Sequence, residues 1–336
     1  MQNICICAKK AVSLQPEIKL AKSGHMTIAI FGNAMKSDTL REVQHILAFL
    51  AQYRKDKLLS ENDLHVVLSQ ELRQELNLRE YPVFNDGFIN DVSRSDEAAP
   101  KGACEPVDFA LSVGGDGTFL TSAAAIGDKN IPILGINCGH LGFLAEVQSQ
   151  DVDDILHKLI AGEYTIELRS LLNVSVLDKE GNKRDSLIMA PNALNEIAIL
   201  KEGLSSMLQI ELKVNGEYLH TYNSDGLVIA TPTGSTAYNL SIGGPLMVPQ
   251  SRGIILTPIA PHSLTVKPLV VPDDWKFDIS VRSRYDAYMV SVDGRSQSLS
   301  TDLTLHVERA NYTTKVVQIG DNSFLNSLKA KLNWGR

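Results

Sequence analysis

The stretch FALSVGGDGTFL, residues Phe109–Leu120, holds an apolar run, a glycine-rich turn with one carboxylate, and the start of a second apolar run. The run Phe109–Val113 predicts a buried strand, and the residues from Thr118 onward predict a helix. In parallel α/β sheets, ligands bind at the carboxyl ends of strands, which is where this turn lies. The stretch therefore predicts a parallel α/β fold with a site at residues 114–118.

The residue types of the turn indicate its chemistry. Its glycines let the backbone approach a phosphate closely, and free N–H groups at a helix start favour an anion. Asp116 cannot attract phosphate, because like charges repel, so we expect it to accept a hydroxyl proton or to help hold a metal ion. The turn matches neither the dinucleotide fingerprint G-x-G-x-x-G nor a phosphate loop ending in Gly-Lys-Ser/Thr. We interpret it as a phosphoryl-transfer site; the alternative is a purely structural glycine turn.

Strands and helices alternate over residues 26–164, which indicates a parallel α/β sheet. The predicted strands are Thr27–Phe31, Leu64–Leu68, Asp108–Val113 and Ile131–Ile136, and the predicted helices are Asp38–Tyr53, Gln70–Leu78, Thr118–Ile126 and Asp151–Ile160. Prolines, glycines and charges fill residues 79–107, so we predict a loop or lid there. Residues 1–25 carry 4 lysines and few periodic apolar positions, and we interpret them as an extension or remnant before the fold.

After residue 164 the pattern changes to short strands. The predicted strands are Tyr164–Arg169, Leu172–Leu177, Glu196–Leu200, Leu208–Val214, Leu227–Thr231, Phe277–Val281, Tyr288–Val292, Leu303–Glu308 and Lys315–Ile319. Gly181-Asn182 and Asn215-Gly216 stand between apolar runs as hairpin turns. We therefore predict a β-rich domain over 165–310 and a tail over 311–336 that ends in a helix at Phe324–Leu332.

Composition narrows the class of protein. The chain has 336 residues, enough for two cores, and its formal net charge of −7 argues against a broad nucleic-acid-binding surface. No apolar stretch reaches the ~20 residues that span a bilayer, so no membrane partner is expected. Cys5, Cys7, Cys104 and Cys138 show neither metal spacing nor a disulfide framework, so we expect reduced thiols in a cytoplasmic protein.

A second polar cluster, Asn195-Glu196, stands where a strand begins. An Asn side chain presents a donor and an acceptor together, which suits a planar amide or an adenine edge. Glu196 can accept from ribose hydroxyls or hold a metal ion. Alone, however, such a pair is more often a solvated strand end.

A third cluster surrounds the buried strand that begins at Leu227. Asn223–Gly226 precedes this strand, and the hydroxyl-rich stretch Thr231–Ser241 follows it. Hydroxyls and backbone N–H groups suit phosphate and ribose, and Tyr238 offers an aromatic face to a base or nicotinamide ring. The alternative is a turn that caps a helix at Ser235 or Thr236, and both can be true.

Isolated histidines and a glycine turn complete the candidates. His140, His220 and His262 lack metal spacing, and of the three we expect His262 to be the one that faces a ligand. Asp293-Gly294-Arg295 is either a hairpin turn or, if the turn faces a cleft, a source of one cation for phosphate.

In order along the chain, these motifs resemble the NAD kinase (ATP-NAD kinase) family. The set that carries the resemblance is Gly114–Thr118, Gly139–Phe143, Asn195-Glu196, Ser224–Gly226, Thr231–Ser241 and Pro261–Leu264. The first motif is shared with diacylglycerol and sphingosine kinases, so the specificity comes from the whole set. The resemblance runs from Met26 to near the C-terminus. It implies an α/β domain with a parallel sheet, an all-β, sandwich-like C-terminal domain, a site in the cleft between them, and a final helix packed back on the N-terminal domain.

The resemblance also implies an activity, ATP + NAD → ADP + NADP, with transfer to the 2′-hydroxyl of the adenosine ribose of NAD. It implies a homodimer or homotetramer in which a neighbouring subunit completes the NAD site. Asp116 is its implied catalytic acid or base. Because the loop has no lysine, a divalent ion, Mg²⁺ above all, is expected mainly on the ATP phosphates.

The resemblance further assigns residues to the nucleotides. Those expected to bind NAD or ATP are Gly114, Gly115, Gly117, Thr118, Phe143, Asn195, Glu196, Asn223, Asp225, Thr233, Thr236, Ala237, Tyr238, Asn239, Leu240, Ser241 and Arg295. Arg295 stands where many bacterial relatives carry glutamine, and Asn223 at a position tied to the choice of NAD or NADH, which stays open. Two rival interpretations also stay open: a lipid kinase with a more apolar acceptor cleft, and a sensor that binds NAD(H) without transferring phosphate.

Overall fold

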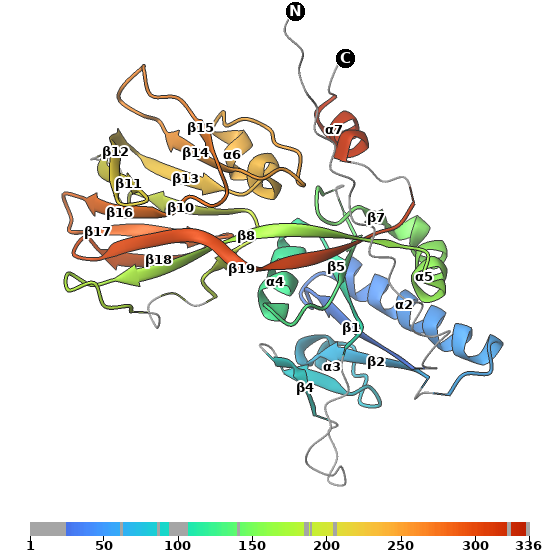
Figure 1. The fold of residues 1–336 in the computed structure, drawn as a ribbon. Coiled ribbons are helices and arrows are strands. Elements are labelled where there is room, and N and C mark those ends of the chain that lie inside the picture. Colours follow the sequence, from blue (N-terminus) through green and yellow to red (C-terminus); the bar gives the residue numbers. More distant parts are fainter. Residues whose placement is uncertain are drawn as a thin grey trace, which may run out of the picture.

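The structure is a computed structural model that describes residues 25–60, 63–85, 88–93, 107–139, 142–184, 188, 190–203, 207–320 and 324–333. The expected N-terminal extension lies outside the described residues except for His25, and so do residues 94–106 of the expected lid. Two bodies lie side by side, a helix-covered sheet and a β-sandwich, joined by the long strands β8 and β19 (Figure 1).

The N-terminal body is built on a parallel sheet. Its elements are β1 (Met26–Gly32), α2 (Ser37–Asp56), β2 (Leu64–Ser69), α3 (Gln70–Glu75), β3 (Val83–Asn85), β4 (Phe88–Ser93), β5 (Phe109–Gly114), α4 (Asp116–Ile126), β6 (Ile133–Asn137), β7 (Val147–Gln148), η1 (Ser149–Asp151) and α5 (Val152–Ala161). The central order is β6-β5-β1-β2-β3, and each of these neighbouring pairs is parallel. The predicted parallel sheet is therefore confirmed.

Helices cover both faces of this sheet, which explains why its strands are continuous apolar runs. Ile28 and Ile30 of β1 share a buried cluster with side chains of α2 and α5. Ala29 and Phe31, which alternate with them, pack instead with α4 side chains. The glycine-rich turn between β5 and α4 thus lies at an edge of the sheet where both flanking elements are held by a core.

The C-terminal body is a sandwich of two largely antiparallel sheets. Its elements are β8 (Thr165–Leu177), β9 (Asn192–Ala193), β10 (Glu196–Leu200), β11 (Leu208–Val214), β12 (Glu217–Ser224), β13 (Gly226–Ala230), η3 (Thr233–Thr236), α6 (Tyr238–Ser241), β14 (Ile254–Ile259), β15 (Leu269–Val271), β16 (Phe277–Arg282), β17 (Ala287–Val292), β18 (Arg295–Ser300) and β19 (Thr304–Gln318). The helix α7 (Phe324–Leu332) follows β19 and lies outside the sandwich (Figure 1). One sheet has the order β15-β14-β13-β10-β17-β18.

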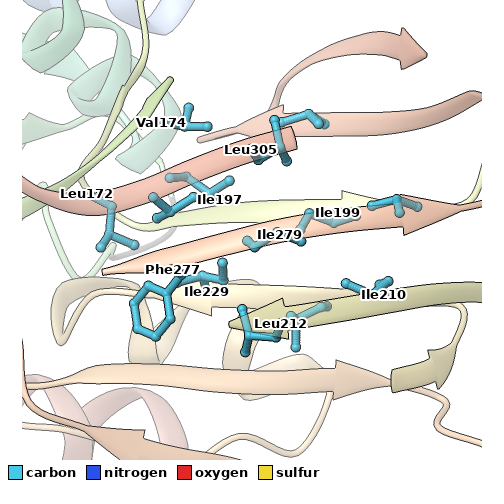
Figure 2. Close-up of a cluster of buried hydrophobic side chains, with 14 of the residues drawn as sticks. Leu172, Val174, Ile197, Ile199, Ile210, Leu212, Ile229, Phe277, Ile279 and Leu305 are labelled. Carbon is cyan, nitrogen blue, oxygen red and sulfur yellow. The ribbon is translucent and has the colours of Figure 1, made fainter. Parts of the chain in front are cut away.

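Side chains from the two sheets interdigitate to form the sandwich core (Figure 2). Ile197 and Ile229 come from β10 and β13 of one sheet, and Ile210 and Ile279 come from β11 and β16 of the other. All four side chains are fully buried. Since each fully buried large aliphatic side chain contributes ~1.5–3 kcal/mol, this layer stabilises the sandwich strongly.

The two bodies share one sheet, which the sequence did not predict. Strands expected as separate pairs, over 164–177 and 303–319, are the continuous strands β8 and β19, which pair with each other. Leu171 of β8 packs in the core of the α/β body, whereas its neighbour Leu172 packs in the sandwich core. The polar residues that interrupt the apolar pattern mark the point where each strand passes from one core to the other.

Three further elements differ from the sequence prediction. The expected loop over 79–107 contains the strands β3 and β4, which pair antiparallel with each other. The helix after the glycine turn begins at Asp116 rather than at Thr118. Strands β12, β14, β15 and β18 were not predicted: β12 and β18 are rich in polar residues, whereas β14 and β15 are short apolar runs that contain or adjoin prolines. Within the described residues, no helix combines the length and the apolar character needed to cross a membrane.

Candidate active site

The glycine turn at the end of β5 leaves room for a ligand to approach its backbone closely. Gly114 has φ +152°, and a Cβ there would lie 2.9 Å from Cβ of Thr118. A Cβ on Gly115 or Gly117 would meet no atom within 4 Å, so the turn faces open space on that side. The first N–H groups of α4 have no partner within the helix. The turn therefore presents backbone N–H donors next to open space, the arrangement that favours an anion.

The Asp116 carboxylate is held by three consecutive backbone N–H groups. Phe143 N donates to Oδ2 at 2.8 Å, and Leu144 N and Ala145 N donate to Oδ1 at 3.0 and 3.1 Å. A carboxylate has about four lone-pair sites, so one site on Oδ2 is left for a further donor. Asp116 is thus fixed in orientation with one acceptor position still open.

Two glycines allow the 142–145 segment to reach Asp116. β6 runs parallel to β5, so the segment that follows β6 emerges at the same edge of the sheet as the glycine turn. A Cβ on Gly135 of β6 would lie 2.8 Å from both Cα of Ala145 and the Leu144 carbonyl oxygen. A Cβ on Gly142 would overlap Oδ1 of Asp116. Of the expected motif Gly139–Phe143, His140 and Leu141 lie outside the described residues.

A second carboxylate, that of Asp293, organises the Asn195-Glu196 motif in the same way. It accepts from the backbone N–H groups of Leu194, Asn195 and Glu196 at 2.7, 2.8 and 3.1 Å. Burial raises the pKa of Asp293, although these three donors and Arg295 act to lower it. Asp293 and Gly294 both have positive φ and form the turn between β17 and β18, so the hairpin interpretation is correct.

Among the carboxyl groups that are predicted to bind nucleotide, Glu196 has the pKa that is shifted furthest from its ordinary value. Burial, followed by the charge of Asp293, raises its pKa from 4.5 to about 7, against a backbone hydrogen bond from Tyr238 that lowers it. Its Oε2 atom is buried and has no hydrogen-bond partner among the described residues. A ligand hydroxyl could fill that position.

The hydroxyl-rich segment that contains η3 and α6 packs directly on this motif. A Cβ on Gly234 would overlap the Asn195 carbonyl oxygen, so the two segments are in close contact. The α6 N-cap residue is Ala237 with no side-chain cap, so the alternative interpretation, a helix cap at Ser235 or Thr236, is wrong. Instead, the Thr231 hydroxyl accepts from Gly234 N at 3.1 Å. Tyr238 has 36% of its surface exposed, which leaves its ring accessible.

The other predicted residues of the segment 236–241 differ in whether their side chains are buried in the turn or lie at the surface. The Asn239 side chain is buried and bonded to Ser235, Pro245 and Thr257, so it shapes the turn from within. Thr236 Oγ1 donates to the Thr233 carbonyl. Ala237 and Leu240 are half-buried, and Ser241 is exposed.

The remaining predicted residues lie along the ends of β12, β13 and β18. Asp225 pairs with Lys201 at 2.7 Å. Asn223 is exposed, and its carbonyl accepts from the backbone N–H of His262, which is also exposed. The Arg295 guanidinium donates to the carbonyls of Ala190 and Asn192.

Sequence reasoning missed a group of four interacting charged residues, Glu146, Glu167, Arg169 and Lys331, of which Lys331 interacts with the charge of Asp116. Arg169 of β8 is 4% exposed and donates to Glu167 at 2.8 Å and to Thr233 at 3.4 Å. Burial raises the pKa of Glu146, which accepts from Ser327 of α7. Lys331 of α7 lies with Nζ 3.7 Å from the Phe143 ring centroid. These contacts with residues 143 and 146 confirm that the final helix packs on the N-terminal body.

A cavity of about 570 Å³ lies between the two bodies but is not the predicted nucleotide site. It borders α4 along Leu120, Ala123 and Gly127, the helical stripe that begins at Asp116. None of the residues predicted to bind nucleotide lines it. Asp116 and Glu196 therefore lie outside the lining of this cavity.

The described part of the chain contains neither a cluster of metal ligands nor a reactive thiol. No group of three or more His, Cys, Asp or Glu side chains there is arranged to hold a metal ion. Cys138 is a free thiol whose pKa is raised to about 11 by burial and by the charges of Glu42 and Asp38, so it is a poor nucleophile. Cys5, Cys7 and Cys104 lie outside the described residues.

Comparison with known proteins gives consistent matches over both bodies. The family model of the ATP-NAD kinase N-terminal domain matches residues 28–164, and that of the ATP-NAD kinase C-terminal domain matches residues 194–319. The NAD kinase of Bacteroides fragilis is 39% identical over 310 residues, which cover 92% of this chain and 98% of that protein. The NAD kinase of Porphyromonas gingivalis is 44% identical over 231 residues, which cover 69% of this chain and 77% of that protein.

Two solved structures share the fold. Yeast NADH kinase complexed with NADH superposes with a TM-score of 0.76 at 23% identity, and the match covers 94% of this chain and 89% of that chain. An NAD kinase from Archaeoglobus fulgidus in complex with ATP gives a TM-score of 0.66 at 24% identity, with coverage of 92% and 99%. The predicted combination of an α/β domain and a β-sandwich is confirmed.

Proposed function

The chain belongs to the ATP-NAD kinase family and makes NADP from NAD and ATP, and we propose that the carboxylate of Asp116 carries the chemistry. In the proposed step, the 2′-oxygen of the adenosine ribose forms a bond to the γ-phosphorus of ATP. The bond between that phosphorus and the β,γ-bridging oxygen breaks, and ADP leaves. The hydroxyl proton moves to Asp116. Such transfers depend mostly on positioning and charge stabilisation.

The open acceptor position on Asp116 Oδ2 is the observation that carries this assignment. Three N–H donors hold the carboxylate, so it cannot rotate away without losing hydrogen bonds worth ~1 kcal/mol each. A general base must lie within hydrogen-bond reach of the proton that it takes, and a fixed carboxylate meets this condition at one defined point. Positioned general bases contribute ~10²–10⁴-fold to the rate.

The start of α4 supports binding of the phosphates beside this base. Gly115 and Gly117 leave open space in front of the backbone, and the N–H groups of Gly115, Gly117 and Thr118 are the proposed donors. We propose that Mg²⁺ arrives on the ATP phosphates, because the loop 114–118 contains no lysine that could offset their charge. When bound, the ion neutralises charge on the transferred phosphoryl group.

NAD would bind on the surface formed by Asn195-Glu196 and the segment that packs on it. The unpartnered Oε2 of Glu196 suits a ribose hydroxyl, and the accessible ring of Tyr238 suits a base or nicotinamide ring. The other residues that we propose along NAD are Phe143, Asn223, Asp225, Thr233, Thr236, Ala237, Leu240, Ser241 and Arg295, with Asn239 holding the turn from within.

Two further aspects of the proposal follow from family membership. We propose that the chain works as a homodimer or homotetramer in the cytoplasm, with a neighbouring subunit completing the NAD site. Light scattering on the purified protein measures the oligomer, and a monomer that is active at nanomolar concentration would contradict it.

Asp116→Asn tests the proposed base. The amide must turn its NH₂ group toward one of the three N–H donors, so the variant should lose ~1–3 kcal/mol of unfolding free energy. It should still bind NAD, whereas turnover in a coupled NADP assay with Mg²⁺ and ATP should fall at least ~10²-fold. Asp128→Asn, at an exposed turn position just beyond the C-terminal end of the same helix, is the matched control.

The assay also separates the rivals. Near-normal turnover of Asp116→Asn would remove Asp116 from the chemistry. Tight NAD binding by the unaltered protein without NADP formation would favour a sensor, and phosphate transfer to sphingosine or diacylglycerol in place of NAD would favour a lipid kinase.

A further inference from the structure

The C-terminal helix brings a buried cation to the proposed transfer site. Lys331 of α7 lies with Nζ 3.7 Å from the ring centroid of Phe143. Its Nζ atom is buried, and in the part of the chain that the structure describes it has no hydrogen-bond partner. Two other contacts hold the helix in place: Phe324 against Phe143 at 6.3 Å between ring centroids, and the hydrogen bond from Ser327 to Glu146.

A buried ammonium group that has no hydrogen-bond partner favours the binding of an anion. It carries three N–H donors and no acceptor, and a buried donor without a partner costs free energy. The face of Phe143 compensates only part of that cost through a cation–π contact. Burial lowers the pKa of Lys331 to about 8, against the charges of Asp116 and Glu146, which raise it. An anionic ligand would supply the missing acceptors.

The position of Phe143 indicates which anion Lys331 would bind. Its ring lies under Lys331, while its backbone N–H donates to Oδ2 of Asp116, the atom that faces the reacting hydroxyl in the proposed mechanism. The glycine turn 114–118 contains no lysine or arginine. Arg169 is already paired with Glu167. Lys331 is therefore a cation placed next to the base and left without a hydrogen-bond partner among the described residues.

We propose that Lys331 binds the γ-phosphoryl oxygens of ATP and offsets their charge during transfer, so that the C-terminal helix supplies a catalytic residue. This inference rests on the proposed function of the same site. Lysine suits the role because its flexible stem carries a compact charge with three donors. The lysine keeps its protons throughout: the proton of the ribose hydroxyl still goes to Asp116, and ADP still leaves with the bridging oxygen.

Lys331→Met tests the proposal, since methionine keeps much of the length and packing but removes the charge. The matched control is Lys329→Met on the same helix, where the lysine is exposed. Each variant is assayed for NADP formation, and its affinities for Mg²⁺-ATP and Mg²⁺-ADP are measured by calorimetry. A contact to the γ-phosphate should appear as a change in the ratio of the two affinities, which a purely structural role would not alter.

We expect Lys331→Met to lower kcat by about 10²-fold, the usual effect of removing one group that stabilises developing charge. The preference for ATP over ADP should fall by about tenfold, whereas Lys329→Met should leave both quantities unchanged and Lys331→Arg should keep most of the preference. A Lys331→Met variant with the preference intact would overturn the proposal, whether or not its turnover is reduced.

Two controls keep the result decisive. If Lys331→Met does not fold, Lys331→Gln is measured in the same way, with a fall in the ATP preference expected and an unchanged preference overturning the proposal. If the unaltered protein forms no NADP, the proposed function fails first. NADP formation by the unaltered protein together with an unchanged ATP preference in the variant overturns only the role of Lys331.

Discussion

Replacing Glu196 with glutamine should change how stability depends on pH. In the folded protein, burial and then the charge of Asp293 raise the pKa of Glu196 from 4.5 to about 7. Each pKa unit corresponds to about 1.4 kcal/mol, so the difference amounts to about 3 kcal/mol between the two protonation states. Because the folded pKa is the higher one, this contribution to stability is fully present below about pH 4.5 and is lost as pH rises through about 7.

A glutamine side chain cannot ionise, so the Glu196→Gln variant should not lose this contribution. The difference in unfolding free energy between variant and unaltered protein should grow by up to about 3 kcal/mol in favour of the variant between pH 4.5 and pH 8. Urea titrations at pH 5, 6, 7 and 8 measure it, and the subtraction removes the other titrating groups. A difference that stays constant over this range would refute the environment that we assign to Glu196.

The same carboxyl group should link NAD binding to pH. Ribose hydroxyls donate to the charged carboxylate, so NAD should bind its deprotonated form and release a proton below about pH 7. The NAD affinity of the unaltered protein should rise about tenfold per pH unit below that pH and then level off, as expected for one linked proton. Calorimetry in buffers of different ionisation enthalpy detects the released proton. Glu196→Gln should bind NAD without this pH dependence, and an equally flat profile for the unaltered protein would remove Glu196 from the NAD contact.

Two more substitutions test the geometry of the site. Gly142→Ala should displace the Asp116 carboxylate, because the new Cβ would overlap Oδ1, and kcat should fall by about 10²-fold. Gly139→Ala, whose Cβ would have only an ordinary contact with Asn137, is the matched control, and equal activity of the two variants would contradict the placement of Asp116. Tyr238→Ala should weaken NAD binding by about 10–100-fold, the range for loss of a stacking ring, with a smaller effect on kcat. Calorimetry against Tyr218→Ala, which also removes an exposed ring, measures this effect, and an unchanged affinity would take Tyr238 out of the site.

Strands, helices and turns that are encoded by neighbouring residues were predicted correctly from the sequence. The apolar run before Gly114, the helical spacing in 38–53 and the Asp293-Gly294 turn each appear in the structure as predicted. Errors occurred where a strand changes its environment. Around Arg169 and around Arg309, polar residues interrupt the apolar pattern, yet β8 and β19 continue, because the strands pass there between two cores. The neighbouring residues in the sequence do not show that each strand continues from one hydrophobic core into the other.

The ordered motifs alone were enough to identify the family, the two kinds of domain and the candidate base, because glycine turns and strand ends are encoded by residues next to one another. Only the tertiary structure decided what surrounds that base. Asp116 is bound by residues 27 to 29 positions later, Asp293 holds a segment almost 100 positions earlier, and Lys331 arrives from the far end of the chain. Such contacts depend on strand pairing and helix packing across the whole fold, so no local pattern in the sequence can specify them.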